Sequence, residues 1–102
     1  MPHKVRTVTP NTSGGAFVQL DPNVNGSVSC AFYGEQNMHV NFVTGVTTAA
    51  DALTEFNAGR FAKLPTGWSA LPGIRYTFDP GKTWVRSPDA TTAGTFNLHM
   101  EW

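Results

Sequence analysis

The chain has 102 residues, of which 14% are charged, and its seven basic and seven acidic residues give a formal net charge of zero. This length corresponds to one domain, and a hydrophobic fraction of 40% excludes a disordered chain, which needs low hydrophobicity and high net charge. A nucleic-acid-binding domain would show a basic excess, so no direct contact with nucleic acid is expected. Weak charge also removes the repulsion that keeps copies apart in solution. It therefore favours a protein of an assembly, with a neutral monomer as the alternative.

Cys30 is the single cysteine, so an intrachain disulfide is impossible. No stretch approaches the 18 or so apolar residues of a membrane span. Residues 1–6 have no apolar stretch behind their positive charges, so we expect no secretory signal. The sequence therefore predicts synthesis in a cytoplasm and no membrane partner.

Residues 1–15 are polar and end in N-T-S-G-G, and we interpret them as an N-terminal arm. Residues 4–9 within this arm are rich in β-branched side chains and could pair as an edge strand that Pro10 ends. Residues 16–102 are predicted to form a single β-rich domain.

Strands are predicted where apolar and polar residues alternate, because successive side chains of a strand point to opposite faces. Turn formers separate these segments, among them Asn25-Gly26 and Asp79-Pro80-Gly81-Lys82. Short connections favour antiparallel hairpins. The predicted hairpins join 16–20 with 27–33, 27–33 with 38–42, and 74–78 with 83–86. The predicted apolar faces are Val28, Cys30 and Phe32; Met38, Val40 and Phe42; and Phe96, Leu98, Met100 and Trp102.

One helix is predicted over about residues 48–58. Thr48 and Asp51 fit a capping box, in which each side chain satisfies a free backbone N–H of the first turn. Gly59 can adopt the left-handed conformation that ends a helix. The apolar stripe consists of Ala49, Ala52, Leu53 and Phe56. The predicted fold is mainly β, an antiparallel sandwich or small barrel with this one short helix covering a sheet face or end.

The segment from Asp21 to Gly26 matches D-x-N-x-N-G, the opening of an EF-hand calcium loop. The twelfth position of such a loop normally supplies a bidentate glutamate, and here it is Phe32. A turn in which Asp21 and the asparagines bond their own backbone is therefore the favoured interpretation, with calcium binding left open.

Other motifs give no catalytic site. Gly81-Lys82-Thr83 matches the end of a phosphate-binding loop, but Tyr76 occupies the position of the required first glycine. A zinc site needs three or four close ligands, and His39 and His99 could meet only on neighbouring strands. No nucleophile elbow or carboxylate pair stands out. We therefore expect a protein that is not an enzyme and has no cofactor or metal.

Aromatic residues are the best candidates for partner contacts. Trp84 is expected in the core, whereas Trp68 lies in an irregular loop and could belong to core or interface. Trp102 follows an alternating strand, where a large apolar side chain must be covered. The predicted partner-binding residues are Trp68, Trp102, His3, Lys4 and Arg6.

The neutral charge, the Thr/Asn/Gly-rich loops and the polar arm give a chain that resembles the small virion proteins of tailed bacteriophages, such as capsid decoration (cement) proteins. The resemblance implies a homo-oligomer that binds the major capsid protein or another virion protein. It also implies location in the virion after synthesis in the host cytoplasm, with binding that stabilises the shell by mass action.

A second interpretation stays open. The chain could be a small soluble binding module, such as a lectin-like or adhesin domain. It would use Trp68, Tyr76 or Tyr33 as an aromatic platform.

Overall fold

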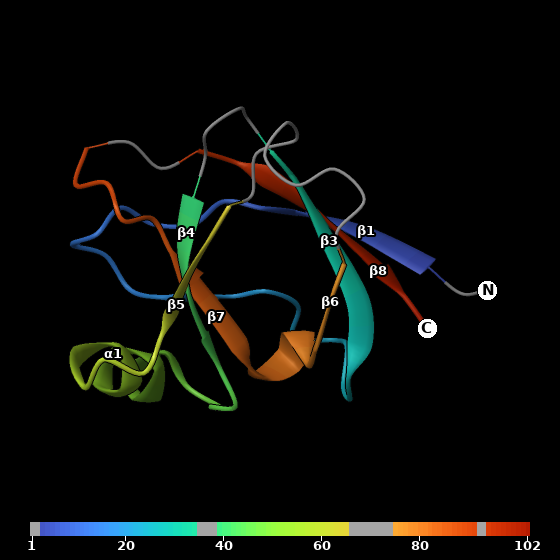
Figure 1. Ribbon diagram of the computed structural model, residues 1–102, viewed down its shortest axis with the longest axis horizontal. Helices are drawn as coiled ribbons and strands as arrows, with labels where there is room; N and C mark the ends of the chain where they lie inside the picture. The colour runs from blue at the N-terminus through green and yellow to red at the C-terminus, as the bar shows by residue number, and fades with distance from the viewer. Residues whose placement is uncertain (1–2, 35–38, 66–74, 92–93) are drawn as a thin grey trace.

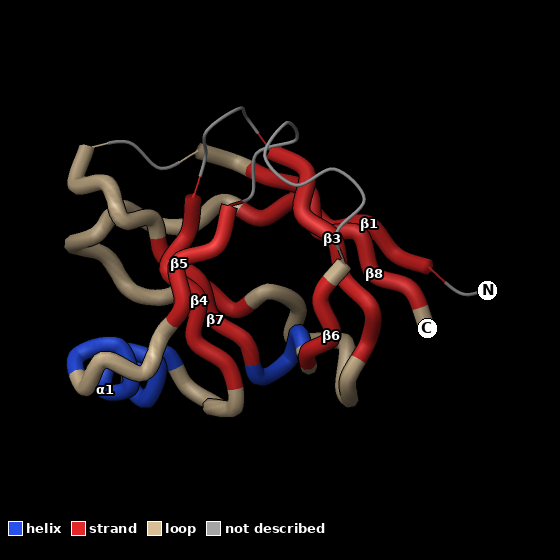
Figure 2. Tube along the Cα trace, in the orientation of Figure 1, coloured by secondary structure: helices blue, strands red, loops and turns tan. Residues whose placement is uncertain are grey.

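A computed structural model of the chain describes residues 3–34, 39–65, 75–91 and 94–102. The described part forms two antiparallel four-stranded sheets and one α-helix (Figures 1 and 2). The first sheet has the order β1-β8-β3-β6 and the second sheet the order β2-β7-β4-β5. In chain order the elements are β1 (His3–Val8), β2 (Val18–Gln19), β3 (Val28–Gly34), β4 (His39–Thr44), α1 (Ala49–Asn57), β5 (Ala62–Pro65), β6 (Tyr76–Phe78), a 3₁₀ turn (Pro80–Lys82), β7 (Thr83–Arg86) and β8 (Phe96–Glu101).

The main core lies between the two sheets, because its buried side chains come from strands of both. Phe32 of β3 is at its centre, with ring centroids 5.9 Å from Phe78, 5.4 Å from Phe96 and 6.5 Å from Phe42. The predicted mainly β fold with one short helix is confirmed, and it is a sandwich rather than a closed barrel. The buried members of this core are Val8, Leu20, Val24, Val28, Cys30, Phe32, Val40, Phe78, Val85, Phe96, Leu98 and Met100.

The chain changes sheets at almost every connection. Of the seven connections between the eight described strands, six cross between the sheets, and only the one from β4 to β5, which contains α1, stays in one sheet. The three predicted hairpins are therefore wrong, since β3 and β6 lie in the first sheet whereas β2, β4 and β7 lie in the second. A turn signal marks a reversal of the chain, but it does not specify whether the next strand pairs beside the last one or packs opposite it.

The predicted turns themselves are present. Gly26 has a φ of +90°, and the Asp79 carboxylate accepts a hydrogen bond of 2.9 Å from the Gly81 N–H at the start of the 3₁₀ turn. A Cβ on Gly81 would lie 2.6 Å from the Val24 carbonyl oxygen, so this position needs a glycine. The turn after β6 and the loop before β3 therefore pack closely against each other.

The first residues are part of the sandwich. β1 pairs with β8 along its whole length, from His3 opposite Glu101 to Val8 opposite Phe96. Further along, the Ser13 N–H donates to the Asp89 carbonyl at 3.0 Å. Residues 3–8 of the segment interpreted as an arm thus form the edge strand that their β-branched side chains allowed. Figure 1 shows the two ends of the chain near each other at one end of the first sheet.

The alternation predicted for the last strand is present. Phe96, Leu98 and Met100 of β8 are buried, and Asn97 and Glu101 are exposed. β8 lies between β1 and β3, so both of its edges are hydrogen-bonded. Of the other predicted apolar faces, Val28, Cys30 and Phe32 point into the core, whereas Met38 lies outside the described residues.

Helix α1 covers the outer face of the second sheet (Figure 1). The Thr48 hydroxyl accepts a 3.1 Å hydrogen bond from the Asp51 N–H, and Gly59 has a φ of +83°, so both predicted ends of the helix are confirmed. Leu53 is an exception to the predicted stripe, since it is 41% exposed. The helix and sheet meet in a second core cluster of Phe17, Val43, Ala52 and Trp84, with Val46, Ala49 and Phe56 packed against it.

Trp84 belongs to this second cluster, as expected. It is 9% exposed, and its indole N–H donates a 2.9 Å hydrogen bond to the Val46 carbonyl. Arg86 of the same strand is also buried, with its guanidinium carbon 4.6 Å from the Phe17 ring centroid and 4.8 Å from that of Phe56. Two aromatic faces and the Gly15 carbonyl, 3.1 Å from Nη1, stabilise this buried cation.

Replacing Thr48 by Ala removes the side-chain acceptor of the helix cap. We expect the free energy of unfolding to fall by about 1 kcal/mol. Thr47→Ala changes the neighbouring exposed threonine and should stay within about 0.5 kcal/mol of the natural protein. Urea denaturation measures both variants, and equal losses would contradict the assigned cap.

Candidate docking site at Trp102

The residues predicted to bind a partner lie in different surroundings. Trp68 lies outside the described residues. Lys4 and Arg6 face the core side of β1, because they pair with Met100 and Leu98, which are buried. Trp102 is 48% exposed. Exposed His3 begins β1 and pairs with Glu101.

Lys4 and Arg6 both reach a buried carboxylate. The Asp21 side chain is 0% exposed, with Oδ2 2.8 Å from Lys4 Nζ and Oδ1 3.3 Å from Arg6 Nη1. The Asn23 N–H donates a 2.9 Å hydrogen bond to Oδ1. Oδ2 makes no directed hydrogen bond, so its contact with Lys4 is an ion pair without ideal hydrogen-bond geometry.

The two cations and the backbone keep Asp21 ionised. Burial raises the pKa of this carboxyl, but the Lys4 ammonium, the Asn23 N–H and the Arg6 charge together outweigh burial and lower the pKa below its ordinary value. Lys4 and Arg6 are therefore held by a partner within their own chain.

The calcium-like loop has the geometry of a turn. The hydrogen bond from the Asn23 N–H to the Asp21 side chain is the local bond by which Asp favours turns. Phe32, at the position where a calcium loop carries its bidentate glutamate, is buried in β3. The Asp21 oxygens face two cations, which is the charge environment opposite to that of a calcium ligand.

The histidines do not gather. His39 is in β4 of the second sheet and His99 in β8 of the first sheet, so their strands are not neighbours. No group of three or more His, Cys, Asp or Glu side chains that could hold a metal occurs among the described residues. Cys30 is in the core, as expected, and burial raises its pKa to about 12, which keeps the thiol protonated near neutral pH.

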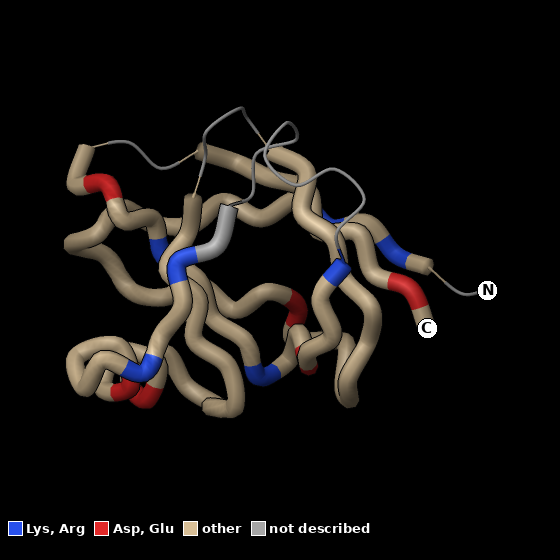
Figure 3. Tube along the Cα trace, in the orientation of Figure 1, with Lys and Arg blue, Asp and Glu red and all other residues tan. Residues whose placement is uncertain are grey.

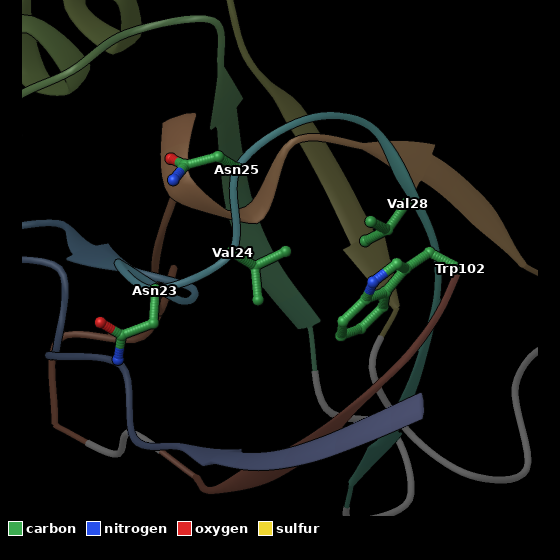
Figure 4. A pocket seen from close by; sticks show the side chains of 5 residues that line it. All are labelled: Asn23, Val24, Asn25, Val28 and Trp102. Carbon is green, nitrogen blue, oxygen red and sulfur yellow. The ribbon is translucent and has the colours of Figure 1, made fainter. Parts of the chain in front are cut away.

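Trp102 lies at one end of the sandwich, beside the loop that leads into β3. The register of β3 and β8 places Ser29 opposite Glu101, so the next pair brings Val28 beside Trp102. A groove of about 300 Å³ opens there (Figure 4). Its lining residues are Asn23, Val24, Asn25, Val28 and Trp102.

The groove has an apolar floor and an amide rim. Val24 and Val28 are 7% and 6% exposed. Figure 4 shows the Val24 side chain directed toward the Trp102 ring, whereas Asn23 and Asn25 project away from it. None of the described residues that line the groove has a titratable side chain. The described lining residues can therefore bind an apolar side chain inside a polar rim, and their side chains are not ones that perform acid–base or nucleophilic chemistry.

The other aromatic candidates also differ in their surroundings. Tyr76 is half-buried, and its ring centroid lies 5.6 Å from that of Phe32, so it packs against the core. Tyr33 is 41% exposed, and its ring contacts that of His99 at a centroid distance of 4.5 Å. The sequence indicated both Trp102 and the 21–26 loop, but only the register of β3 and β8 shows that they form one site.

Comparison of the chain with protein-family models, with curated proteins and with solved structures gives no match. Within the described residues, no helix has both the length and the apolar character needed to span a membrane.

Asp21→Asn should remove an acid-sensitive part of the stability. Because the folded pKa of Asp21 is lowered, its stabilising effect is fully present above the unfolded value of about 3.9 and is lost as the pH falls from there through the folded pKa. We expect this variant to lose roughly 1–3 kcal/mol at pH 7 and to show a shallower fall in stability below pH 4. Denaturation across pH 2–7 measures both effects.

Thr47→Ala, at an exposed side chain without a charge, is the control and should keep the acid dependence of the natural protein. If Asp21→Asn and the natural protein lose stability in parallel below pH 4, the ion pair does not contribute as assigned.

Calcium should leave the melting temperature unchanged. At about 10 mM calcium, even a site with a Kd of about 1 mM would add about 1.4 kcal/mol of stability, a shift of several degrees for a domain of this size. Melting curves in calcium, in magnesium and in a chelator measure this. A rise specific to calcium that Asp21→Asn abolishes would restore the calcium interpretation.

Proposed function

We propose that this protein is a non-catalytic structural subunit of a large assembly and that it binds a partner protein through the Trp102 groove. The half-exposed indole beside two buried valines carries the proposal. Tryptophan in a well-packed pocket is among the residues that contribute most to protein interfaces. No titratable side chain is found among the described lining residues, and the chain has no net charge, so apolar packing supplies the binding.

The resemblance to capsid decoration proteins gives the proposal its finer form. In that form the partner is the major capsid protein or another virion protein, and the protein is located in the virion. Lys4 and Arg6 are held by Asp21, so the docking surface centres on Trp102 rather than on the basic residues of β1.

A lectin-like binding module is the second candidate, because Tyr33 is exposed enough to stack on a sugar. The Trp102 groove suits a sugar less well. Its two asparagine amides project away from the ring, so stacking and hydrogen bonding would not converge on one sugar (Figure 4).

Fractionation of the source material tests the assembly proposal. We expect this 11.0 kDa chain to sediment with large particles in a density gradient, followed by mass spectrometry. Its presence solely among free proteins, together with a melting temperature that rises with a sugar, would refute the assembly role and support the lectin-like candidate.

Trp102→Ala tests the docking site. Labelled natural protein should rebind to particles stripped of it, and the variant should bind at least about 30-fold more weakly, as for an interface hot spot. Leu53→Ala, at a side chain of similar exposure on α1, should bind normally. Denaturation checks that both variants are folded, and normal binding by folded Trp102→Ala would contradict the assigned site.

A further inference from the structure

The first sheet has an outer face that no described element covers, whereas α1 covers the outer face of the second sheet (Figure 1). Side chains directly opposite each other in an antiparallel pair share a face, so the strand registers define this surface. It comprises His3, Val5 and Thr7 of β1; Asn97, His99 and Glu101 of β8; Ser29, Ala31 and Tyr33 of β3; and Thr77 of β6.

We infer that this outer face binds a second copy of the chain. A stripe of Val5, His99 and Ala31 crosses the face at mid-length, because Val5 and Ala31 both pair with His99, and Ala31 is buried within it at 3% exposure. Tyr33 extends the stripe through its ring contact with His99. Val5 and Tyr33 are 50% and 41% exposed. Two half-exposed apolar side chains, on the strands that flank His99 of β8, are the part of this face that another protein would cover.

The charges on this face favour a second copy over a charged partner. Glu101 is the one charged residue of β3 and β8, and Arg75, which hydrogen-bonds to Ser29, lies 3.9 Å from it (Figure 3). Both charges lie toward one end of the face. Among the described residues, the surface therefore has one neutralised pair and no excess charge that would select an acidic or basic partner.

At the opposite end of the face, the described residues carry no charge. The Thr7 hydroxyl donates a 2.9 Å hydrogen bond to Asn97, and the hydroxyls of Thr9 and Thr95 are 3.1 Å apart. A two-fold axis along the stripe would place the stripe of one copy on that of the other and each charged end against the uncharged end of its partner. No like charges then face each other, as a self-complementary interface requires.

The sheet edges disfavour the alternative of pairing strand to strand. The edge strand β1 has inward-facing Lys4 and Arg6, β2 and β6 have two and three residues, and β5 ends on Pro65. Inward charges, short edge strands and proline are the devices that prevent edge-to-edge pairing. The face is therefore the better surface for contact between copies.

The size of the face sets the expected strength. β1, β3 and β8 have six or seven residues and β6 has three. With strands about 4.8 Å apart, they make a face of roughly 400 Å². Two such faces bury roughly 800 Å², which is below the size of most stable interfaces. The pair is therefore weak in free solution. It becomes stronger when an assembly holds copies side by side, because binding is then governed by effective concentration. This last step rests on the proposed function.

Sedimentation velocity of the whole chain over about 10 μM to 2 mM, which covers the range of weak association, tests the inference. The mean mass of the natural protein should rise from 11.0 kDa toward twice that value. Val5→Lys and Tyr33→Lys should each weaken the association at least about 10-fold. Leu53→Lys, at the same 41% exposure as Tyr33 but on α1, should associate normally.

A natural protein that stays monomeric throughout, or an association that only Leu53→Lys weakens, would overturn the inference. Denaturation shows whether each variant is folded. If Tyr33→Lys does not fold, Val5→Lys, at the more exposed position, still tests the inference. If the chain is monomeric and its Tyr33→Lys variant fails to bind particles, the face binds the partner protein instead of a second copy. If the chain is monomeric and a sugar raises the melting temperature of the natural protein, the face binds that sugar. If the chain forms dimers but is absent from particles, the proposed function is wrong and the inference about the outer face stands.

Discussion

The structure depends on the burial of one sheet against the other by a chain that crosses between them after almost every strand. Phe32 shows the consequence, since its ring packs against Phe78 and Phe96 of its own sheet and Phe42 of the opposite one. Because successive strands lie in different sheets, most strands pair with strands that are distant in sequence, as β1 and β3 do with β8. Contacts of this kind make folding cooperative and slow relative to helical proteins.

The connection from β2 to β3 places a carboxylate where its charge must be compensated. It buries Asp21, and a buried carboxylate is costly unless it is paired and hydrogen-bonded. Lys4 and Arg6 provide the pairing from the core side of β1. The same inward charges protect an exposed edge strand, because a second strand docking there would have to accommodate them. One cluster therefore completes the core and leaves the strand edge a poor interface.

The elements that could be predicted from the sequence are those defined by local chemistry. The cap at Thr48, the end of α1 at Gly59 and the alternation of β8 depend on residues within a few positions of each other. The hairpins were wrong because pairing depends on competition between all strands. Leu53 was misplaced because the sheet contacts a narrower stripe of the short helix than its sequence offers. The Trp102 groove required the register of β3 and β8, which no local pattern specifies.

The two proposed surfaces follow from what the sandwich leaves uncovered. Its core and α1 bury most apolar residues, its edges are protected, and its basic strand is internally paired. The outer face of the first sheet and the end groove at Trp102 remain, and they point in different directions. A surface for copies and a separate surface for a partner let weak contacts act together, since each bound copy raises the effective concentration of the next. A neutral chain suits this arrangement because copies can gather on a shell without mutual repulsion.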